Sequence, residues 1–354
     1  MSATQGPARR AAVARAALPR TPSGLVWVSD DKPGIRRERV GDGFAYRDAE
    51  GHRIRRAAEL KRIRALAIPP AYEKVWICAR PNGHLQATGR DARGRKQYRY
   101  HAEWRQARDA GKFARMLEFG AVLPRIRTRV EADLAAPVGA TPRRATVLAT
   151  LVRLLDTTLV RIGNDEYART NRSYGLTTLR NRHADVKGSR LLLRFRGKSG
   201  IEHDVSLDDP RVARVVRRCQ AMAGQDLFQY VDEEGAVHAV GSADVNDYLR
   251  ELSGADFKAK DFRTWHGSVH ALDLWAAECG VDPASRRRPN ELLAEVAKLL
   301  RNTVAVCKKA YVHPRVLVAL SAPAEAALLA TLKVPRRAGL SEAERRLLAF
   351  LGPD

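Results

Sequence analysis

The sequence predicts an α+β fold: a small N-terminal domain rich in β-sheet, followed by a larger, mostly α-helical domain that contains a β-hairpin or small sheet. Three observations predict it. Short runs of β-branched and aromatic residues are concentrated before residue 108, apolar residues recur at helical spacing after residue 110, and one strand-like stretch interrupts the helices at 189–207. A chain of 354 residues is also long enough for two domains.

The N-terminal domain is assigned to residues 24–108. Its predicted strands have the β-branched and aromatic residues typical of strands and lie at 25–30, 44–48 and 74–80. Pro81, Asn82 and Gly83 form a turn signal, which predicts that 74–80 pairs with 84–91 as a hairpin. Residues 57–67 have helical spacing and stop before two prolines. Residues 1–23, which are rich in Ala and Arg and contain no acidic residue, are interpreted as a disordered basic arm.

The second domain is assigned to residues 109–354. Thr141 and Pro142 are the N-cap and first residue expected of a long helix that runs to about Val160. Two apolar-rich strands within 189–207 flank a tight turn at 197–200. Ser341 and Glu344 form the capping box of a last helix. Further helices are predicted at 208–223, 242–252, 261–279 and 289–301.

The composition indicates a polyanionic partner. The formal net charge is +23 and the isoelectric point is about 10.5, which suits nucleic acid or an anionic membrane surface. No apolar run approaches the roughly 18 residues that span a bilayer, so we do not expect this chain to be a membrane protein. The four cysteines lack zinc-ligand spacing and suggest reduced thiols in a cytosolic protein. We expect neither a metal centre nor another cofactor.

A stretch in the first domain, KQYRYH at 96–101, alternates aromatic residues with long polar ones. In a strand, Tyr98 and Tyr100 would share one face, and Gln97 and Arg99 the other. Such donors and flat rings suit a DNA groove or backbone. A solvated strand with two tyrosines packed on the core explains the pattern equally well.

Four segments of the second domain carry residues suited to phosphate chemistry. Arg161 follows the long helix, Lys198 lies at the hairpin tip, and Arg263 lies in the first turn of a helix that begins within KDFRTWHGS. The last segment, NTVAVCKKAYVHP, places Asn302 nine residues before Tyr311. Each segment alone is more often an ordinary surface feature.

In this order, the segments resemble the type IB DNA topoisomerases, and most closely their bacterial and poxvirus-like branch, over about residues 25–320. The resemblance implies that Tyr311 attacks the scissile phosphorus and forms a 3′-phosphotyrosyl bond. Arg161 and Arg263 would hold the non-bridging oxygens, and Lys198 would protonate the departing 5′-hydroxyl. Asn302 stands where many relatives have histidine and would donate a hydrogen bond. His266 stands where a small residue is usual in the family. It is interpreted as a tolerated substitution on the helix surface or in the packing, and a position near the site is the alternative.

The resemblance also implies the reaction and its setting. The enzyme would relax supercoiled duplex DNA by transient single-strand cleavage, strand rotation and religation, without ATP or an obligatory metal. Residues 96–101 would lie in the major groove, and the protein would act as a monomer clamped around duplex DNA, in the cytoplasm at the bacterial nucleoid. A tyrosine recombinase usually has histidine three residues before the second arginine, where this chain has Lys260. A non-catalytic basic DNA-binding protein is the other alternative.

Overall fold

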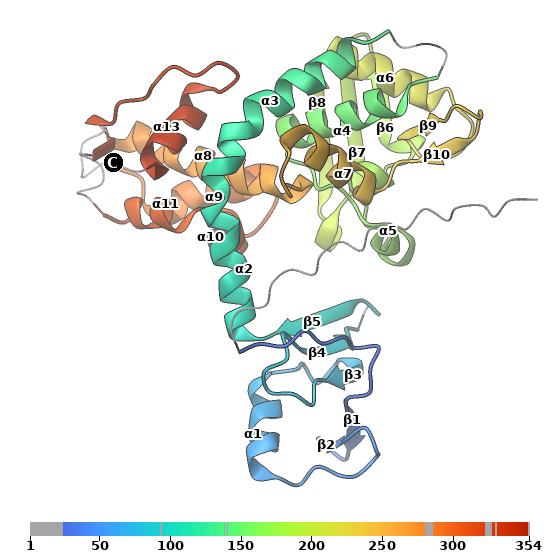
Figure 1. Ribbon diagram of the computed structural model, residues 1–354, viewed down its shortest axis with the longest axis vertical. Helices are drawn as coiled ribbons and strands as arrows, with labels where there is room; N and C mark the ends of the chain where they lie inside the picture. Colours follow the sequence, from blue (N-terminus) through green and yellow to red (C-terminus); the bar gives the residue numbers. More distant parts are fainter. Residues whose placement is uncertain are drawn as a thin grey trace, which may run out of the picture. The chain divides into compact units, whose positions relative to one another are not determined.

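The computed structural model describes residues 24–92, 94–137, 139, 141–279, 286–322, 328–329 and 331–352. The predicted basic arm, residues 1–23, lies outside the described residues. The chain divides into two compact units between Arg108 and Asp109 (Figure 1). The first is built on an antiparallel sheet and the second mainly on helices, which confirms the predicted α+β class.

The first unit is a five-stranded antiparallel sheet in the order β2-β1-β3-β4-β5, with one helix. The predicted hairpin is confirmed, because β3 pairs with β4 in a register that opposes Ile77 and Ala87. A small core of five buried residues packs between sheet and helix: Ile35, Ile63, Val75, Ile77 and Ala87. The elements are β1 (Ile35–Val40), β2 (Gly43–Arg47), α1 (Ala57–Ala65), β3 (Glu73–Ile77), β4 (Leu85–Arg90) and β5 (Lys96–Tyr100).

The strand predicted at 25–30 is wrong. Only Val26 makes an isolated bridge, to Gly83. The reason lies in the next residues, where the Val28 amide donates to the His84 ring at 3.1 Å instead of to a neighbouring strand. The Trp27 ring stacks on the same histidine, with centroids 4.0 Å apart. Aromatic packing therefore replaces the regular ladder here.

The second unit combines its helices with a three-stranded sheet, β6-β7-β8, and a two-stranded sheet, β10-β9. The hairpin predicted within 189–207 is confirmed as β7 and β8. The strands are β6 (Ala184–Lys187), β7 (Arg190–Arg196), β8 (Glu202–Asp208), β9 (Gln229–Val231) and β10 (Val237–Ala239), with short 3-10 turns η1 (Leu176–Thr178), η2 (Asn181–His183) and η3 (Lys198–Gly200). Helix α2 (Ala102–Ala114) crosses the boundary between the units. The helices that follow are α3 (Met116–Ala135), α4 (Arg144–Thr158), α5 (Asp165–Asn171), α6 (Pro210–Gln220), α7 (Ser242–Ser253), α8 (Ala259–Cys279), α9 (Pro289–Leu299), α10 (Val304–Ala310), α11 (Pro314–Ala319) and α13 (Glu342–Leu351).

Of two predicted helix starts, one is confirmed and the other is wrong. The capping box of the last helix is confirmed, because the amides of Ser341 and Glu344 each bond the other's side chain. The predicted cap at Thr141 is wrong. Arg143 keeps an extended backbone (φ −71°, ψ 152°), so α4 begins only at Arg144.

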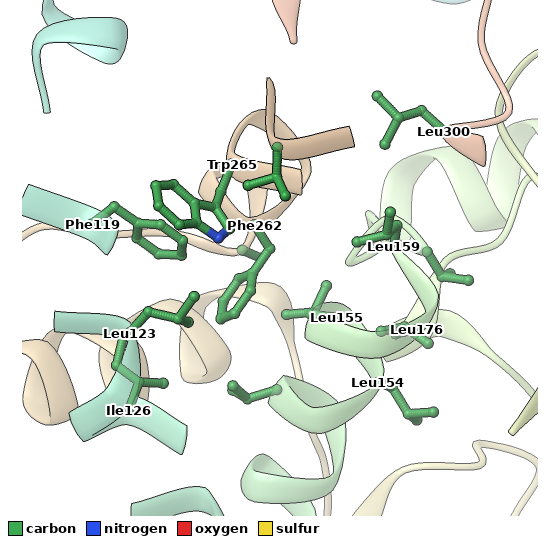
Figure 2. Packing of buried hydrophobic residues seen from close by; sticks show 14 of the residues in the cluster. Phe119, Leu123, Ile126, Leu154, Leu155, Leu159, Leu176, Phe262, Trp265 and Leu300 are labelled. Carbon is green, nitrogen blue, oxygen red and sulfur yellow. The ribbon is translucent and has the colours of Figure 1, made fainter. Parts of the chain in front are cut away.

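The core of the second unit joins α3, α4 and α8. Figure 2 shows Phe262 and Trp265 of α8 beside Phe119 of α3, and α4 contributes Leu154 and Leu155. Phe119 meets Phe262 edge to face, with ring centroids 5.2 Å apart. Because aromatic and leucine side chains fix α8 on two neighbours, the polar residues along this helix have defined positions.

A buried ionic network ties the same helices to α13. Arg127 of α3 pairs with Asp156 of α4 and with Glu344 of α13, each at 2.8 Å. His266 Nε2 lies 2.7 Å from Asp156 Oδ1, which gives the unexpected histidine a role in packing α8 against α4. Burial by itself would raise the pKa of Asp156, but His266 and Arg127 outweigh it and hold that pKa well below its usual range.

A matched pair of glycine substitutions tests this packing. A Cβ at Gly120 in α3 would lie 2.4 Å from the ring of Trp265, whereas a Cβ at Gly111 in α2 meets nothing within 4 Å. We expect Gly120→Ala to lower the free energy of unfolding by about 1–3 kcal/mol through overpacking. Gly111→Ala should leave it equal or raise it by up to about 1 kcal/mol through helix propensity. Urea denaturation measures both, and equal effects would contradict the packing described.

Candidate active site

The segment after α4 fixes Arg161. Leu159 ends the helix in the left-handed conformation (φ 57°), which turns the chain toward Arg161. The Arg161 carbonyl then accepts the Leu176 amide at 2.9 Å, and the Ile162 carbonyl accepts the Thr177 amide at 2.7 Å. The backbone on which Arg161 stands is thus hydrogen-bonded to a neighbouring turn.

Arg263 is a buried cation held by backbone carbonyls. Its side chain is 4% exposed and donates to the carbonyl of Leu159 and, at 2.6 Å, to the carbonyl of Leu300. No carboxylate of the described residues pairs with it, and its Nε has no hydrogen-bond partner there. Burial, followed by the nearby charge of Arg161, lowers its pKa. A buried guanidinium with a free donor is suited to an anionic ligand.

The predicted position of Arg263 in the first turn of its helix is wrong. Helix α8 begins at Ala259, so Arg263 is its fifth residue. The start lies earlier because the Asp261 carboxylate accepts the Lys258 amide at 2.8 Å and closes the first turn. The arginine therefore acts through its side chain alone, without the free amides of a helix end.

Asn302 is hydrogen-bonded to Arg161. Arg161 Nη2 donates to Asn302 Oδ1 at 2.8 Å, while the backbone amide of Asn302 donates to the Ala297 carbonyl at 2.8 Å. The amide group Nδ2 of Asn302 is buried and has no partner in the part of the chain that the structure describes. Arg161 and Asn302 thus form one unit with a donor still available.

Tyr311 lies at the C-terminal end of α10, next to both arginines. The Arg263 guanidinium carbon is 5.1 Å from the centroid of the tyrosine ring. Burial by itself would raise the pKa of the Tyr311 hydroxyl, but Arg263 and then Arg161 outweigh it, so that the pKa is lowered. On α8, Ser268 Oγ donates to the Tyr311 carbonyl at 3.2 Å, and a Cβ at Gly267 would lie 2.9 Å from that carbonyl. The close approach at Gly267 therefore lets α8 support the tyrosine backbone.

Lys198 stands apart from these four residues. It is exposed at the tip of the β7–β8 turn, beside the left-handed Ser199 (φ 64°). No described contact joins its side chain to Arg161, Arg263, Asn302 or Tyr311. The second strand of the hairpin does approach the site, because Arg301 Nη2, next to Asn302, donates to the Asp204 carbonyl of β8 at 3.2 Å. The structure therefore brings together four of the five predicted site residues.

His203 is a neighbour of the site that the sequence patterns did not single out. It is 5% exposed and stacks on Phe195, with centroids 4.5 Å apart. Burial, followed by the charges of Arg301, Arg161 and Arg263, lowers its pKa to about 4, so this ring is neutral near pH 7. The alternation along β8 marks it as an inward residue, but only the fold shows that the arginines lie nearby.

The four residues predicted to contact DNA lie on β5 of the first unit. Tyr98 and Tyr100 share a face as expected, with stacked rings 6.1 Å apart, and Tyr98 is 46% exposed. Gln97 donates to Asp91 at 3.0 Å, and Arg99 donates to the Ala67 carbonyl at 2.9 Å. Tyr98 is thus exposed to solvent, whereas both polar side chains make internal bonds.

The described ranges contain neither a metal-binding group of side chains nor a membrane-spanning helix. Within them, no group of three or more His, Cys, Asp or Glu side chains is arranged to hold a metal ion. No helix there has the length and apolar character needed to cross a membrane.

Comparison with known proteins gives consistent matches along the chain. Residues 101–327 match the model of the catalytic core of eukaryotic DNA topoisomerase I, and residues 43–91 match that of the N-terminal domain of bacterial DNA topoisomerase IB. The DNA topoisomerase 1B of Acanthamoeba polyphaga mimivirus is 32% identical over 288 residues, which cover 79% of this chain and 85% of the relative. The DNA topoisomerase I of Monkeypox virus is 23% identical over 258 residues, covering 70% of this chain and 75% of the relative.

The electrostatic coupling at Tyr311 can be measured directly. Since Arg161 lowers the pKa of the Tyr311 hydroxyl, we expect Arg161→Ala to raise that pKa. Titration of ring-labelled tyrosine by carbon NMR reports it, with the resonance assigned through Tyr311→Phe. Arg214→Ala, at an exposed position of α6, is the matched control and should leave the titration unchanged. A Tyr311 pKa that stays the same or falls in Arg161→Ala would contradict the arrangement.

Proposed function

Because the chain belongs to the type IB DNA topoisomerase family, we propose that it relaxes supercoiled duplex DNA by cutting one strand, allowing rotation and rejoining the ends. The observation that carries this function is the cluster around Tyr311. Arg161 and Arg263 have no carboxylate partner among the described residues, and two buried donors, Arg263 Nε and Asn302 Nδ2, have no hydrogen-bond partner there. The family assignment favours this function over the two alternatives, a tyrosine recombinase and a non-catalytic basic DNA-binding protein.

In the cleavage step, the Tyr311 hydroxyl oxygen attacks the scissile phosphorus. A tyrosyl–phosphorus bond forms, the bond to the 5′-oxygen of the next nucleotide breaks, and the phosphate stays on the 3′ side. The phenolic proton passes to solvent water as the bond forms, and the departing oxygen gains a proton to become a 5′-hydroxyl. A lowered Tyr311 pKa favours the phenolate that attacks.

Charge develops on the non-bridging oxygens as phosphorus becomes five-coordinate. Arg161 and Arg263 would bind these oxygens, and Asn302 Nδ2 would donate a further hydrogen bond without titrating near neutral pH. The free Nε of Arg263 and the free Nδ2 of Asn302 support this assignment, because an anion would satisfy both donors. Each fixed donor of this kind can lower the barrier by about 3 kcal/mol.

Lys198 would act as the general acid toward the 5′-oxygen. An alkoxide is a much poorer leaving group than a phenolate, so protonation of this oxygen is needed. An exposed lysine at the tip of a hairpin whose second strand is hydrogen-bonded to Arg301, the neighbour of Asn302, suits this role, since bound DNA would lie between turn and tyrosine.

The covalent bond conserves the energy of the broken ester, so that religation requires neither ATP nor another energy source. We further propose that the protein acts as a monomer that clamps duplex DNA, with Tyr98 and Tyr100 facing the major groove. Gln97 and Arg99 would exchange their internal bonds for contacts with DNA. In a bacterium, such an enzyme would work on the nucleoid.

Plasmid relaxation tests the activity and the nucleophile. We expect the wild type to relax a supercoiled plasmid in EDTA without ATP, because the proposed charges come from side chains. Tyr311→Phe lacks the attacking oxygen and should lose at least about 1,000-fold in rate. His238→Phe, at an exposed position of β10, controls for an aromatic replacement and should keep full activity. Activity surviving in Tyr311→Phe would mean that another residue attacks the DNA.

The general acid is tested by changing the leaving group. We expect Lys198→Ala to cleave an ordinary duplex at least about 100-fold more slowly than the wild type. A substrate with sulfur in place of the scissile 5′-oxygen needs no proton to depart, so it should restore the rate of Lys198→Ala. Cleavage of both duplexes is followed under single-turnover conditions, with Lys187→Ala as the control for an exposed lysine of the same sheet. A defect that persists on the sulfur substrate would exclude this role for Lys198.

A further inference from the structure

A second cationic site lies in the same unit, in a cavity of about 740 Å³ that we call the arginine pocket. Four arginines line it, together with two aspartates, Asp165 and Asp226. The arginines come from α5, from the residue that ends it and from the segment around η2: Arg169, Arg172, Arg180 and Arg182. None of these residues belongs to the cluster around Tyr311.

The four arginines outnumber the two aspartates of the pocket, so its lining has a formal excess of two positive charges. Within the described ranges none of them forms an ion pair, although Arg127 and Arg153 of the same unit pair with buried aspartates at 2.8 and 3.2 Å. The two arginines that do make side-chain bonds use neutral partners. Arg180 donates to Gln225 at 2.8 Å, and Arg182 donates to the Tyr174 hydroxyl at 3.4 Å. Four unpaired guanidinium groups around one cavity favour a bound anion with several oxygens.

Two further features support an anionic ligand. Gly241, which also lines the pocket, is the N-cap of the 12-residue helix α7, whose N-terminal end carries partial positive charge. His183 stands beside the η2 arginines, and burial, followed by the charges of Arg182 and Arg180, lowers its pKa. The helix end and the two arginines beside His183 therefore both add positive charge near the pocket.

The pocket shares a wall with the active-site segment. Thr177, which lines the pocket, donates its amide to the Ile162 carbonyl at 2.7 Å and its hydroxyl to the same carbonyl at 3.0 Å. Ile162 follows Arg161 directly. A duplex carries one phosphate charge per about 1.7 Å of its axis. DNA held at Arg161 would therefore have further phosphates within reach of this wall.

We propose that the arginine pocket binds a backbone phosphate of the duplex being cleaved, at a position other than the scissile phosphate. This rests on the proposed function, since it requires DNA at Arg161. The phosphate would dock the DNA against the turn that supports the Arg161 backbone. The pocket would contribute affinity and register without contacting the reacting atoms.

The test is a binding measurement in the full chain that carries Tyr311→Phe, which prevents cleavage. The double variant Arg172→Gln/Arg180→Gln is compared with Arg218→Gln, a control for an exposed arginine of α6 outside the pocket. Loss of two phosphate-binding arginines should weaken binding of a short duplex on the order of tenfold and reduce the salt dependence by about one to two ions. The control should bind as the parent does, and thermal melting verifies that each variant is folded.

Methylphosphonates locate the phosphate, because they remove one backbone charge at a time. We expect one methylphosphonate, away from the scissile position, to weaken DNA binding by the parent protein but not by the double variant. Unchanged affinity in the double variant would overturn the proposal, as would a loss of equal size on every methylphosphonate duplex. A defect confined to supercoiled plasmid would assign the pocket to a second DNA segment. If inorganic phosphate stabilises the parent but not the double variant, while the two bind DNA equally, the pocket would be assigned to free phosphate. Either of these last two results would overturn the proposal.

Plasmid relaxation by the wild type distinguishes a failure of the proposed function from a failure of the pocket proposal. Binding by Tyr311→Phe variants needs no chemistry, so it remains informative even if strand cleavage fails. Conversely, a pocket that binds no DNA phosphate would leave relaxation by the wild type intact.

Discussion

The buried charge of Arg263 is the constraint on which the site depends. A guanidinium taken out of water is costly unless hydrogen bonds and an opposite charge compensate it. Here two backbone carbonyls, of Leu159 and Leu300, supply the hydrogen bonds, and no carboxylate of the described residues supplies the charge. The fold therefore holds a buried cation that has no carboxylate partner among the described residues, and Tyr311 lies beside it.

Several elements of the second unit hold that cation in place. The left-handed turn at Leu159 aims one carbonyl, and the end of α9 supplies the other. The aromatic core and the network of Asp156 and Arg127 fix α8 against α3, α4 and α13. Since Ser268 and Gly267 on that helix also support Tyr311, one rigid element places both the buried Arg263 and the tyrosine. This kind of preorganisation allows fixed donors to lower a reaction barrier.

Much of this could be predicted from the sequence where the signal is local. The hairpin at 189–207 follows from its apolar strands and turn residues. The capping box follows from two side chains, those of Ser341 and Glu344. The strand at 25–30 could not be excluded in this way, because His84, far along the chain, takes the Val28 amide. Motif order identified Arg161, Arg263, Asn302 and Tyr311, but the burial of Arg263 and the proximity of His203 depend on how distant elements pack. The arginine pocket likewise combines segments that no local pattern connects.

The central claim is that Tyr311 attacks a phosphate held by Arg161, Arg263 and Asn302. Trapping the covalent complex on a duplex whose cleaved fragment diffuses away, followed by protease digestion and mass spectrometry, tests it most directly. The account predicts one modified peptide, with a nucleotide joined through its 3′-phosphate to Tyr311. A nucleotide on any other residue, or one joined through a 5′-phosphate, would contradict the account.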